Sequence, residues 1–380
     1  SIVKGLGFDS FGLGANACTV DIDEEQDKIL RIRPFHFDEH QTPEELNAWK
    51  LEARGKTFEP GFKTLISPLS LCYKKRVYSK NRIPYPMRRV DWDPNGERHP
   101  ETRGTSGYER ISWDEAMDII ADECLRIKEA YGPEAIITGQ GTGRVANHWH
   151  CRINSSLGLE GWSLVPTHVC LMPHILPNAF TLGVFSSAAG DMRNAHCAVL
   201  WGQNPAMETA WCKEVFKNQA AGITKLIVID VRFQDMSKHA DVALQPRPGT
   251  DAALALAFMH EIIEHGWYDP EFIENWTYGF DELAERAKEF DVKRVSEITW
   301  VPEEKIIAAA RMLGNAKNST LQWGVAVDMT REAMPAGQAI LALWEITGNM
   351  ERPGGMIVAP EILSVAGGWG REILGPEQEA

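Results

Sequence analysis

The sequence lacks three features that would place it in common protein classes. Its seven cysteines include no C-x-x-C pair, which argues against a zinc ribbon or a disulfide framework in a chain of 380 residues. It has no run of about eighteen apolar residues, so we expect no transmembrane helix. Positive charge is scarce as well. The net charge of −14 argues against a nucleic-acid surface, because neutralising phosphates requires clustered Lys and Arg.

The amino terminus also lacks a recognisable export signal. Residues 1–14 are glycine-rich and contain neither an apolar core nor a twin arginine. The sequence therefore predicts a cytoplasmic protein. A removed signal is the alternative, because the chain does not begin with Met.

What the sequence has in quantity is apolar residues, 44% of the chain, and they are not confined to low-complexity tracts. A chain of this length and composition can bury two or three cores, so we expect a multi-lobed globular protein. In its second half, four segments have the pattern of buried strands: residues 195–200, 225–229, 242–244 and 321–327.

Polar or glycine-containing segments follow these expected strands. They are WGQNP at 201–205, Asp230, QPRPGTDAAL at 245–254 and GNMERPGG at 348–355. After WGQNP, an amphipathic helix is expected from about Glu208. Glycine loops at strand ends expose N–H groups to anions, and an acidic residue there can accept hydrogen bonds from a nucleotide. The pattern predicts one nucleotide-sized site at the carboxyl edge of a parallel sheet.

In order and spacing, these segments resemble the molybdopterin oxidoreductases of the dimethyl sulfoxide reductase type. In that family two molybdopterin guanine dinucleotides hold one molybdenum or tungsten atom. The resemblance implies that one dinucleotide is bound by Trp201, Gly202, Asn204, Pro205, Glu208, Asp230, Arg232, Gly249, Thr250, Asp251, Asn349, Arg352 and Gly354. Lys74 resembles the family's lysine that lies against a pterin, with a solvated surface lysine as the alternative.

The resemblance also implies the fold class. We expect an α/β, dimethyl sulfoxide reductase-like fold with a small N-terminal β-containing lobe and two doubly wound parallel-sheet lobes. The expected boundaries are an N-terminal lobe at 1–104, an α/β lobe with the molybdenum-ligand loop at 105–190, a dinucleotide-binding lobe at 191–360 and a tail or linker at 361–380. Nothing after Gly355 resembles the family's C-terminal β-barrel domain, so we expect the N-terminal part of a longer, split or truncated catalytic subunit.

In this family a protein side chain commonly supplies a fifth ligand to the metal. Aligning Asn154, Gly158 and Trp162 with the relatives places Cys170 at that position, and a thiolate is a suitable soft donor. An inert buried cysteine is the alternative reading.

Four histidines, at 148, 150, 168 and 174, are candidates to lie near the metal. The resemblance implies that Arg144, His148 and His150 enter or border the substrate funnel. The candidate catalytic residues are His148, His168 and Arg144, because an imidazole can protonate a departing hydroxyl and cationic groups can neutralise an oxyanion.

Most of the family carries a four-cysteine iron–sulfur motif in its N-terminal lobe, whereas this chain has only Cys18 and Cys72 there. We therefore expect no iron–sulfur cluster in this chain and a separate iron–sulfur electron-transfer subunit as its partner. Segments 49–58, 82–89, 93–98 and 108–116 are similar to the branch of transhydroxylase large subunits and catechol dehydroxylases.

The expected function is that of a molybdenum-dependent catalytic subunit. It would act on small phenolic aromatics by reductive dehydroxylation or hydroxyl transfer. Three alternatives stay open: another activity of the family, such as acetylene hydration or respiratory reduction of an oxyanion or sulfur compound; a non-catalytic truncated relative; and an unrelated nucleotide-binding reductase.

Overall fold

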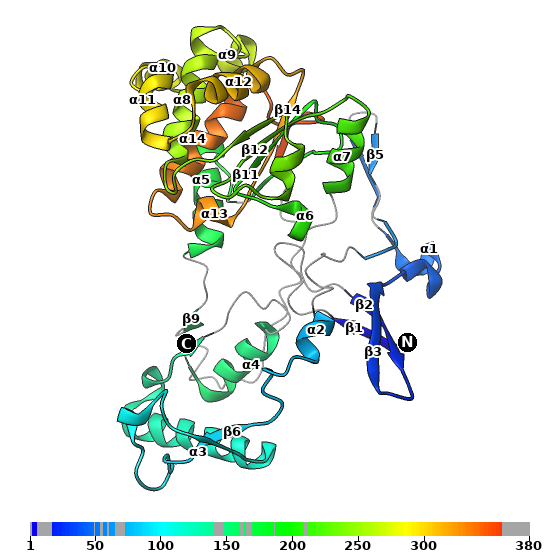
Figure 1. Ribbon diagram of the computed structural model, residues 1–380, viewed down its shortest axis with the longest axis vertical. Helices are drawn as coiled ribbons and strands as arrows, with labels where there is room; N and C mark the ends of the chain where they lie inside the picture. The colour runs from blue at the N-terminus through cyan, green and yellow to red at the C-terminus, as the bar shows by residue number, and fades with distance from the viewer. Residues whose placement is uncertain are drawn as a thin grey trace. The chain divides into compact units, whose positions relative to one another are not determined.

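The computed structural model describes residues 2–5, 17–48, 50–53, 56–58, 61–64, 73–139, 147–159, 163–164, 169–185, 187–208 and 212–358. These residues form two compact units, the first ending at residue 164 and the second running from 169 to 358 (Figure 1). Each unit is described by itself. Within the described ranges, none of the helices combines the length and the apolar character that crossing a membrane requires.

The first unit begins with a three-stranded antiparallel sheet of β1 (Ile2–Gly5), β2 (Ala17–Asp23) and β3 (Lys28–Pro34). Cys18 and Val20 alternate along β2 and are buried on one face of this sheet. A small β-containing lobe is thus present at the N-terminal end, as predicted. Short elements follow: η1 (Phe37–Glu39), α1 (Pro43–Leu46), the antiparallel pair β4 (Leu51–Ala53) and β5 (Lys56–Phe58), and α2 (Tyr73–Val77).

The rest of the first unit is built around α3 (Trp113–Tyr131). Ser112 caps this helix by accepting a hydrogen bond from the Glu115 N–H at 3.0 Å. The Glu115 carboxylate forms an ion pair with Arg88, 3.1 Å away. Around α3 lie β6 (Met87–Arg89), η3 (Pro100–Thr102), β7 (Tyr108–Arg110), η4 (Pro133–Ala135), β8 (Thr138–Gly139), α4 (Asn147–Leu157) and β9 (Ser163–Leu164). Only the two-residue pair β8–β9 is parallel among the described strands of this unit.

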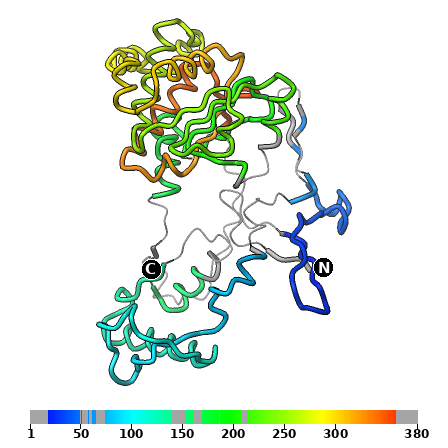
Figure 2. The backbone as a smooth tube through the Cα atoms, in the orientation of Figure 1, coloured from blue at the N-terminus to red at the C-terminus, as the bar shows by residue number. Residues whose placement is uncertain are grey.

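The second unit contains a four-stranded parallel sheet in the order β13-β12-β11-β14. Its strands are β11 (Cys197–Trp201), β12 (Lys225–Ile229), β13 (Val242–Leu244) and β14 (Ser319–Trp323). β14 comes more than a hundred residues after β11, yet it lies beside it, as the green and orange segments of Figure 2 show. The first three strands agree with the sequence analysis to within about two residues.

Helices cover both faces of this sheet (Figure 1). On one face, Val199, Ile227 and Leu321, which lie side by side on β11, β12 and β14, pack with α8 (Asp251–Glu264) and α14 (Ala333–Ile346). On the other face, Leu200 and Val228 pack with α7 (Cys212–Ala220). The remaining elements are α5 (Leu171–Leu182), β10 (Ala188–Gly190), α6 (Pro205–Glu208), η7 (Asp235–His239), α9 (Pro270–Trp276), α10 (Phe280–Ala287), α11 (Val292–Thr299), α12 (Glu303–Gly314), α13 (Val325–Asp328) and β15 (Met356–Val358).

One expectation from the sequence needs correction. The strand expected at 321–327 is β14 followed by the short helix α13, since the chain turns at Gly324. In the second unit, α5 packs on α14.

Candidate functional site

The strand order places a topological switch point at the carboxyl ends of β11 and β14. The chain leaves β11 toward β12 and β13 on one side and later returns to β14 on the other side. In open α/β sheets, ligands bind outside the carboxyl ends of the strands at this switch point. The two loops touch here: the Gly324 N–H donates to the Trp201 carbonyl at 2.8 Å, and a Cβ on Gly324 would collide with the Gly202 carbonyl oxygen. Only glycine fits at position 324.

The loop after β11 is joined to the start of α8 by Trp201. Its indole Nε1 donates to Asp251 Oδ1 at 2.7 Å, and its ring is buried. Burial of the Asp251 carboxyl raises its pKa, while the hydrogen bond from Trp201 acts in the opposite direction. Gly202 has φ +64°, a left-handed conformation that favours glycine. Two of the predicted binding segments therefore meet through a direct side-chain contact.

Two acceptors on the same loop are buried without donors. Gln203 is 9% exposed and Asn204 is 8% exposed, and neither Gln203 Oε1 nor Asn204 Oδ1 has a hydrogen-bond partner in the described part of the chain. Leaving a buried acceptor unpaired costs about 1–3 kcal/mol. Such atoms fit a ligand that brings N–H or O–H donors, for example the edge of a purine base.

Asp230, directly after β12, is held by its neighbours. Its Oδ1 accepts from the Arg232 N–H at 2.9 Å, and its Oδ2 accepts from Gln234 Nε2 at 3.2 Å. Gln234 Nε2 also donates to the Gln203 carbonyl at 2.6 Å. The buried Gln234 thus connects the loops after β11 and β12, a role that sequence reasoning missed because a lone glutamine carries no signal.

The turn before α8 contains a glycine in the left-handed conformation. Gly249 has φ +78°, and no atom lies within 4 Å of a Cβ built on it. Thr250 Oγ1 donates to the Arg247 carbonyl at 2.7 Å and so closes the turn instead of capping α8. This leaves the first N–H groups of α8 beside Asp251 without a side-chain cap.

Cys170 lies directly before α5, at its N-cap position, and is half-buried. The positive end of a helix dipole favours a thiolate there. One turn later, His174 contacts Asp328 of α13 and Trp323 of β14. The helix that begins at Cys170 is therefore attached to the carboxyl end of β14, beside the loop after β11.

Three other predicted binding residues lie at the opposite end of the sheet. Asn349 Oδ1 accepts from the N–H of Ser319, the first residue of β14, at 3.0 Å. Arg352 donates to the Gly348 and Lys317 carbonyls, and the Gly354 N–H donates to Asp191. A five-residue strand separates its two ends by about 13 Å. The expectation that this loop lies at the carboxyl edge is therefore wrong, and its polar groups hold the amino edge together.

The remaining predicted residues lie in the first unit or outside the described residues. Lys74, in the first unit, donates to the Leu30 carbonyl at 3.0 Å and is exposed. His150 contacts Thr138 Oγ1 at 2.8 Å. Arg144 and His168 lie outside the described residues, as do the side chains of His148 and Glu208.

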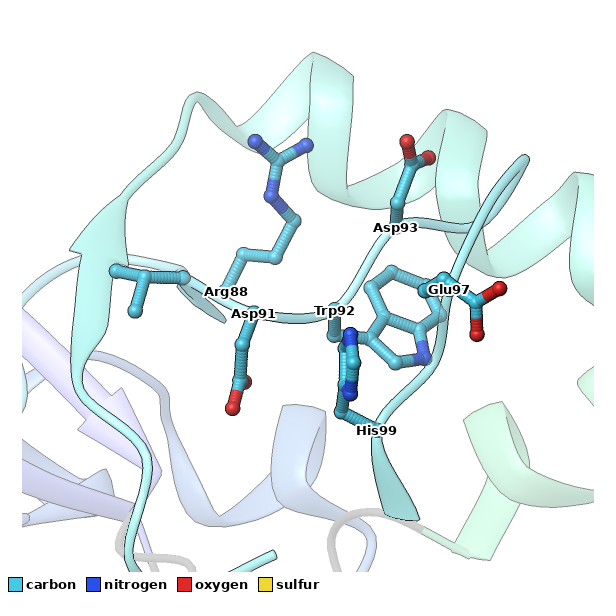
Figure 3. A pocket seen from close by; sticks show the side chains of 7 residues that line it. Arg88, Asp91, Trp92, Asp93, Glu97 and His99 are labelled. Carbon is cyan, nitrogen blue, oxygen red and sulfur yellow. The ribbon is translucent and has the colours of Figure 1, made fainter. Parts of the chain in front are cut away.

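The first unit contains a polar pocket (Figure 3). It is lined by Arg88, Val90, Asp91, Trp92, Asp93, Glu97 and His99. Hydrogen bonds from Ser106 and Thr102 hold the pKa of Asp91 below its usual value. Asp91 and Asp93 point away from each other in Figure 3, so these carboxylates do not converge on one ligand. We find no group of three or more metal-ligating side chains among the described residues.

The parallel sheet, its switch point and the glycine loops define an α/β lobe of the nucleotide-binding class. A family model described as molybdopterin oxidoreductase matches residues 82–370, and one described as pyrogallol hydroxytransferase large subunit-like, domain 1, matches residues 16–76. The chain therefore belongs to the molybdopterin oxidoreductase family. The resemblance predicted from the sequence is confirmed.

Several relatives are similar over most of the chain. The pyrogallol hydroxytransferase large subunit of Pelobacter acidigallici is 32% identical over 326 residues, which cover 78% of this chain and 36% of that protein. Acetylene hydratase of Syntrophotalea acetylenica is 31% identical over 304 residues, covering 77% and 40%. Formate dehydrogenase H of Escherichia coli is 30% identical over 251 residues, covering 64% and 35%. The chain thus spans about two fifths of the length of these relatives.

A solved structure confirms the fold class. Acetylene hydratase from Pelobacter acetylenicus aligns with a TM-score of 0.68 and 25% sequence identity, over 99% of this chain and 48% of that one. The mixed α/β fold of the dimethyl sulfoxide reductase type, expected from the sequence, is therefore confirmed. Membership of the family implies molybdenum or tungsten with molybdopterin.

Proposed function

We propose that this chain is part of a molybdenum-dependent catalytic subunit that binds two molybdopterin guanine dinucleotides. The observation that carries the proposal is the loop after β11, at the switch point between β11 and β14, where the buried acceptors of Gln203 and Asn204 have no donor in the described part of the chain. A guanine base offers N–H donors of the kind that these atoms need. Family membership supports the same cofactor class.

The chain's own residues have distinct roles in this proposal. Gln203 and Asn204 accept hydrogen bonds from the dinucleotide, and Asp230 and Asp251 offer further carboxylate oxygens beside them. Cys170 supplies a thiolate ligand from the start of α5. When bound, the cofactor would supply a two-electron redox centre and a site for oxygen or hydroxyl transfer.

The proposed catalytic residues remain His148, His168 and Arg144. An imidazole at the funnel would hold or donate a proton at the leaving oxygen, and the arginine would neutralise negative charge on it. Lys74 is retained as a proposed pterin contact. Asn349, Arg352 and Gly354 have a structural role at the amino edge in the described arrangement, and binding of the dinucleotide by them is a weaker proposal.

The proposed substrates are small phenolic aromatics such as catechols and pyrogallols, transformed by reductive dehydroxylation or hydroxyl transfer. The support is the similarity to a relative named pyrogallol hydroxytransferase and to its first domain over residues 16–76. Hydration of an unsaturated carbon is the second candidate, favoured by the structural similarity to acetylene hydratase. A non-catalytic relative is the alternative that a metal-free protein would support.

We also propose a separate iron–sulfur subunit as the electron-transfer partner, and a cytoplasmic location. Cys18 is fully buried in the small antiparallel sheet beside Val20, so in this arrangement its thiol packs in a core. The support for a separate subunit is that the chain has only Cys18 and Cys72 in the segment that matches the family's four-cysteine motif.

The test is metal and pterin analysis of the protein purified anaerobically, together with a Cys170→Ala variant. We expect stoichiometric molybdenum or tungsten with guanine nucleotide. In the variant, the X-ray absorption spectrum of the metal should show one fewer sulfur scatterer. Activity toward catechols or pyrogallols should fall about a hundredfold or more, since even second-layer residues of metal sites contribute about 10–100-fold.

Cys124→Ala is the matched control, because Cys124 is also half-buried but lies on α3 of the first unit. It should leave the spectrum and the activity unchanged. Absence of both metals from the unaltered protein would contradict the enzymatic proposal, and an unchanged spectrum in Cys170→Ala would contradict the ligand role of Cys170.

A further inference from the structure

Three side chains from three elements form a cluster at the carboxyl end of β14, which we call the His174 cluster: His174 of α5, Trp323 of β14 and Asp328 of α13. His174 Nδ1 lies 3.2 Å from Asp328 Oδ2 and 3.3 Å from Oδ1. Trp323 Nε1 donates to Asp328 Oδ1 at 2.9 Å. The imidazole also lies against the Trp323 ring, with 4.4 Å between ring centroids.

The contacts fix the orientation of the imidazole. A carboxylate only accepts hydrogen bonds, so Nδ1 is the nitrogen that donates to Asp328. The side chain of Asp328 is 6% exposed and that of His174 is 19% exposed, so both lie largely away from water. A buried carboxylate requires its partners, and removing one donor leaves the charge incompletely paired. The ring of His174 is therefore held on two sides, through its edge and through its face.

His174 is the fourth residue of α5, whose first residue, Leu171, directly follows Cys170. The cluster therefore holds the first turn of α5, and Cys170 is joined to this turn through the peptide bond to Leu171. Farther along the helix, Asn178 donates to the His174 carbonyl at 2.7 Å and accepts from the Ala188 N–H at 3.1 Å.

The other end of the cluster reaches the predicted dinucleotide loop. Asp328 ends α13, a helix that starts just after Gly324. Gly324 donates to the Trp201 carbonyl at 2.8 Å, and a Cβ built on Gly202 would lie 3.5 Å from Val327 Cγ2. Contacts and the chain itself therefore connect the first turn of α5, through Asp328, α13 and Gly324, to Trp201.

We propose that His174 is a positioning residue: through Asp328 and Trp323 it fixes the first turn of α5, and hence Cys170, against the carboxyl end of β14. The role of Cys170 as a metal ligand rests on the proposed function, but the attachment of its helix turn does not. His174 itself need not touch the metal or the substrate. Its effect would be to hold the thiol in one place relative to the loop after β11.

Two substitutions of His174 separate its hydrogen bond from its ring. His174→Asn keeps an N–H donor near the position of Nδ1 and loses the ring contact with Trp323. His174→Phe keeps a ring against Trp323 and loses the donor. Asp328→Asn removes the negative charge of the carboxylate that accepts from His174. Thr181→Val, near the opposite end of α5, is the control for a substitution on the same helix, because Thr181 Oγ1 is buried and makes no hydrogen bond in the described part of the chain.

The first readout needs no cofactor. The metal-free protein is treated with iodoacetamide at fixed pH, and labelling of each cysteine is followed by peptide mass spectrometry. We expect the rate at Cys170 to rise about tenfold in His174→Phe and Asp328→Asn, since a hydrogen bond to a charged group is worth about that factor or more. His174→Asn should stay within about twofold of the unaltered protein, and Thr181→Val should match it.

Cys197 reports on global unfolding in the same sample, because it is fully buried in β11 and burial raises the pKa of its thiol to about 12. Equal labelling of Cys170 in the unaltered protein and all His174 and Asp328 variants, with Cys197 protected throughout, would overturn the proposal. If Cys197 becomes labelled in His174→Phe, the milder pair of His174→Asn and Asp328→Asn decides. The proposal then requires that the labelling rate at Cys170 rise in Asp328→Asn but not in His174→Asn. Equal labelling rates at Cys170 in these two variants would overturn it.

The second readout uses the protein purified anaerobically with its metal. The X-ray absorption spectrum of the metal should change in His174→Phe and be restored in His174→Asn, with pterin content unaltered in both. Raised labelling of Cys170 with an unchanged spectrum would contradict the ligand role, which belongs to the proposed function, and would leave the positioning role supported.

Discussion

Asn204 is a buried residue whose acceptor lacks a donor. Its Oδ1 is buried without a partner in the described part of the chain, which costs about 1–3 kcal/mol in the cofactor-free protein. We expect Asn204→Leu, which keeps the number and branching of the side-chain heavy atoms, to leave the melting temperature of the cofactor-free protein unchanged or to raise it. The same change should lower the guanine nucleotide content of the anaerobically purified protein. Calorimetry and nucleotide analysis of the two proteins measure these effects.

Asn178 provides the comparison for Asn204. It is fully buried, and both polar atoms of its amide are hydrogen-bonded. Asn178→Leu should therefore destabilise the cofactor-free protein, by about 1–3 kcal/mol for the groups left unpaired. If both leucine variants lowered the melting temperature equally, Asn204 would not be an unpaired acceptor.

Glu345 gives the second unit a pH dependence. Burial near the end of α14 raises the pKa of its carboxyl to about 7, above the usual 4.5. The folded state therefore binds this proton more tightly than the unfolded chain, so its contribution to stability is complete below about pH 4.5 and is lost as the pH rises through about 7. We expect Glu345→Gln to be more stable than the unaltered protein at pH 8, by at most about 3 kcal/mol, and equal to it near pH 4.5.

Urea titrations of both proteins across this pH range measure the difference. The control is Glu285→Gln on α10, because Glu285 is exposed and pairs with Lys288 at 2.6 Å on the surface. A stability difference between Glu345→Gln and the unaltered protein that did not change with pH would show that the raised pKa is not the cause.

Several residues at the switch point could be named from the sequence, but their partners could not. Trp201 and Asp251 were both predicted to bind the dinucleotide, whereas the hydrogen bond between them joins positions fifty residues apart. Asp328 and His174 are separated by 154 positions, and His174 was only one of four candidate histidines. Contacts of such sequence separation depend on the strand order, which short segments of sequence do not determine.

At the scale of elements, the packing of α5 on α14 depends on one glycine. A Cβ on Gly337 would lie 2.5 Å from Pro177 Cγ and 2.8 Å from Pro177 Cβ. Alanine favours a helix interior by about 1 kcal/mol over glycine, but the collision should outweigh this gain. We expect Gly337→Ala to lower the stability by about 1–3 kcal/mol.

The matching double variant, Gly337→Ala with Pro177→Ala, separates the collision from other effects. Removing the proline ring should make room for the added methyl group and restore most of the loss, which a double-mutant cycle in urea would detect as a coupling of the two sites. Strictly additive effects of the two changes would mean that the helices do not meet at these residues.

Element types were easier to predict than element ends. The strands around 197–201, 225–229 and 242–244 are short apolar runs bounded by turn residues, and the structure has them within about two residues. Residues 325–327 are equally apolar and β-branched in part, yet they form α13. The strand ends before them because the Trp323 indole donates to Asp328 and the Gly324 N–H donates to the Trp201 carbonyl. Local propensity carries no information on those tertiary contacts.

At the scale of the whole molecule, the family could be identified from three segments in order, and the comparisons confirm it. Their arrangement in space was predicted only in part. The loop at 348–355 was expected beside WGQNP, but it holds the amino ends of the strands through Ser319, Asn318 and Asp191. Order along the chain does not specify which edge of a sheet a returning loop reaches.

The sequence by itself determined the α/β class, three of the four strand segments of the parallel sheet and the chemistry of the loops, because apolar periodicity, glycine and acidic side chains act locally. The tertiary structure decided the rest. It brought the first turn of α5 to the end of β14, joined Trp201 to Asp251, and left the acceptors of Gln203 and Asn204 buried without donors in the described residues. The reason is that burial and pairing depend on which strand lies beside which, and that order is set by the packing of the whole sheet with its helices.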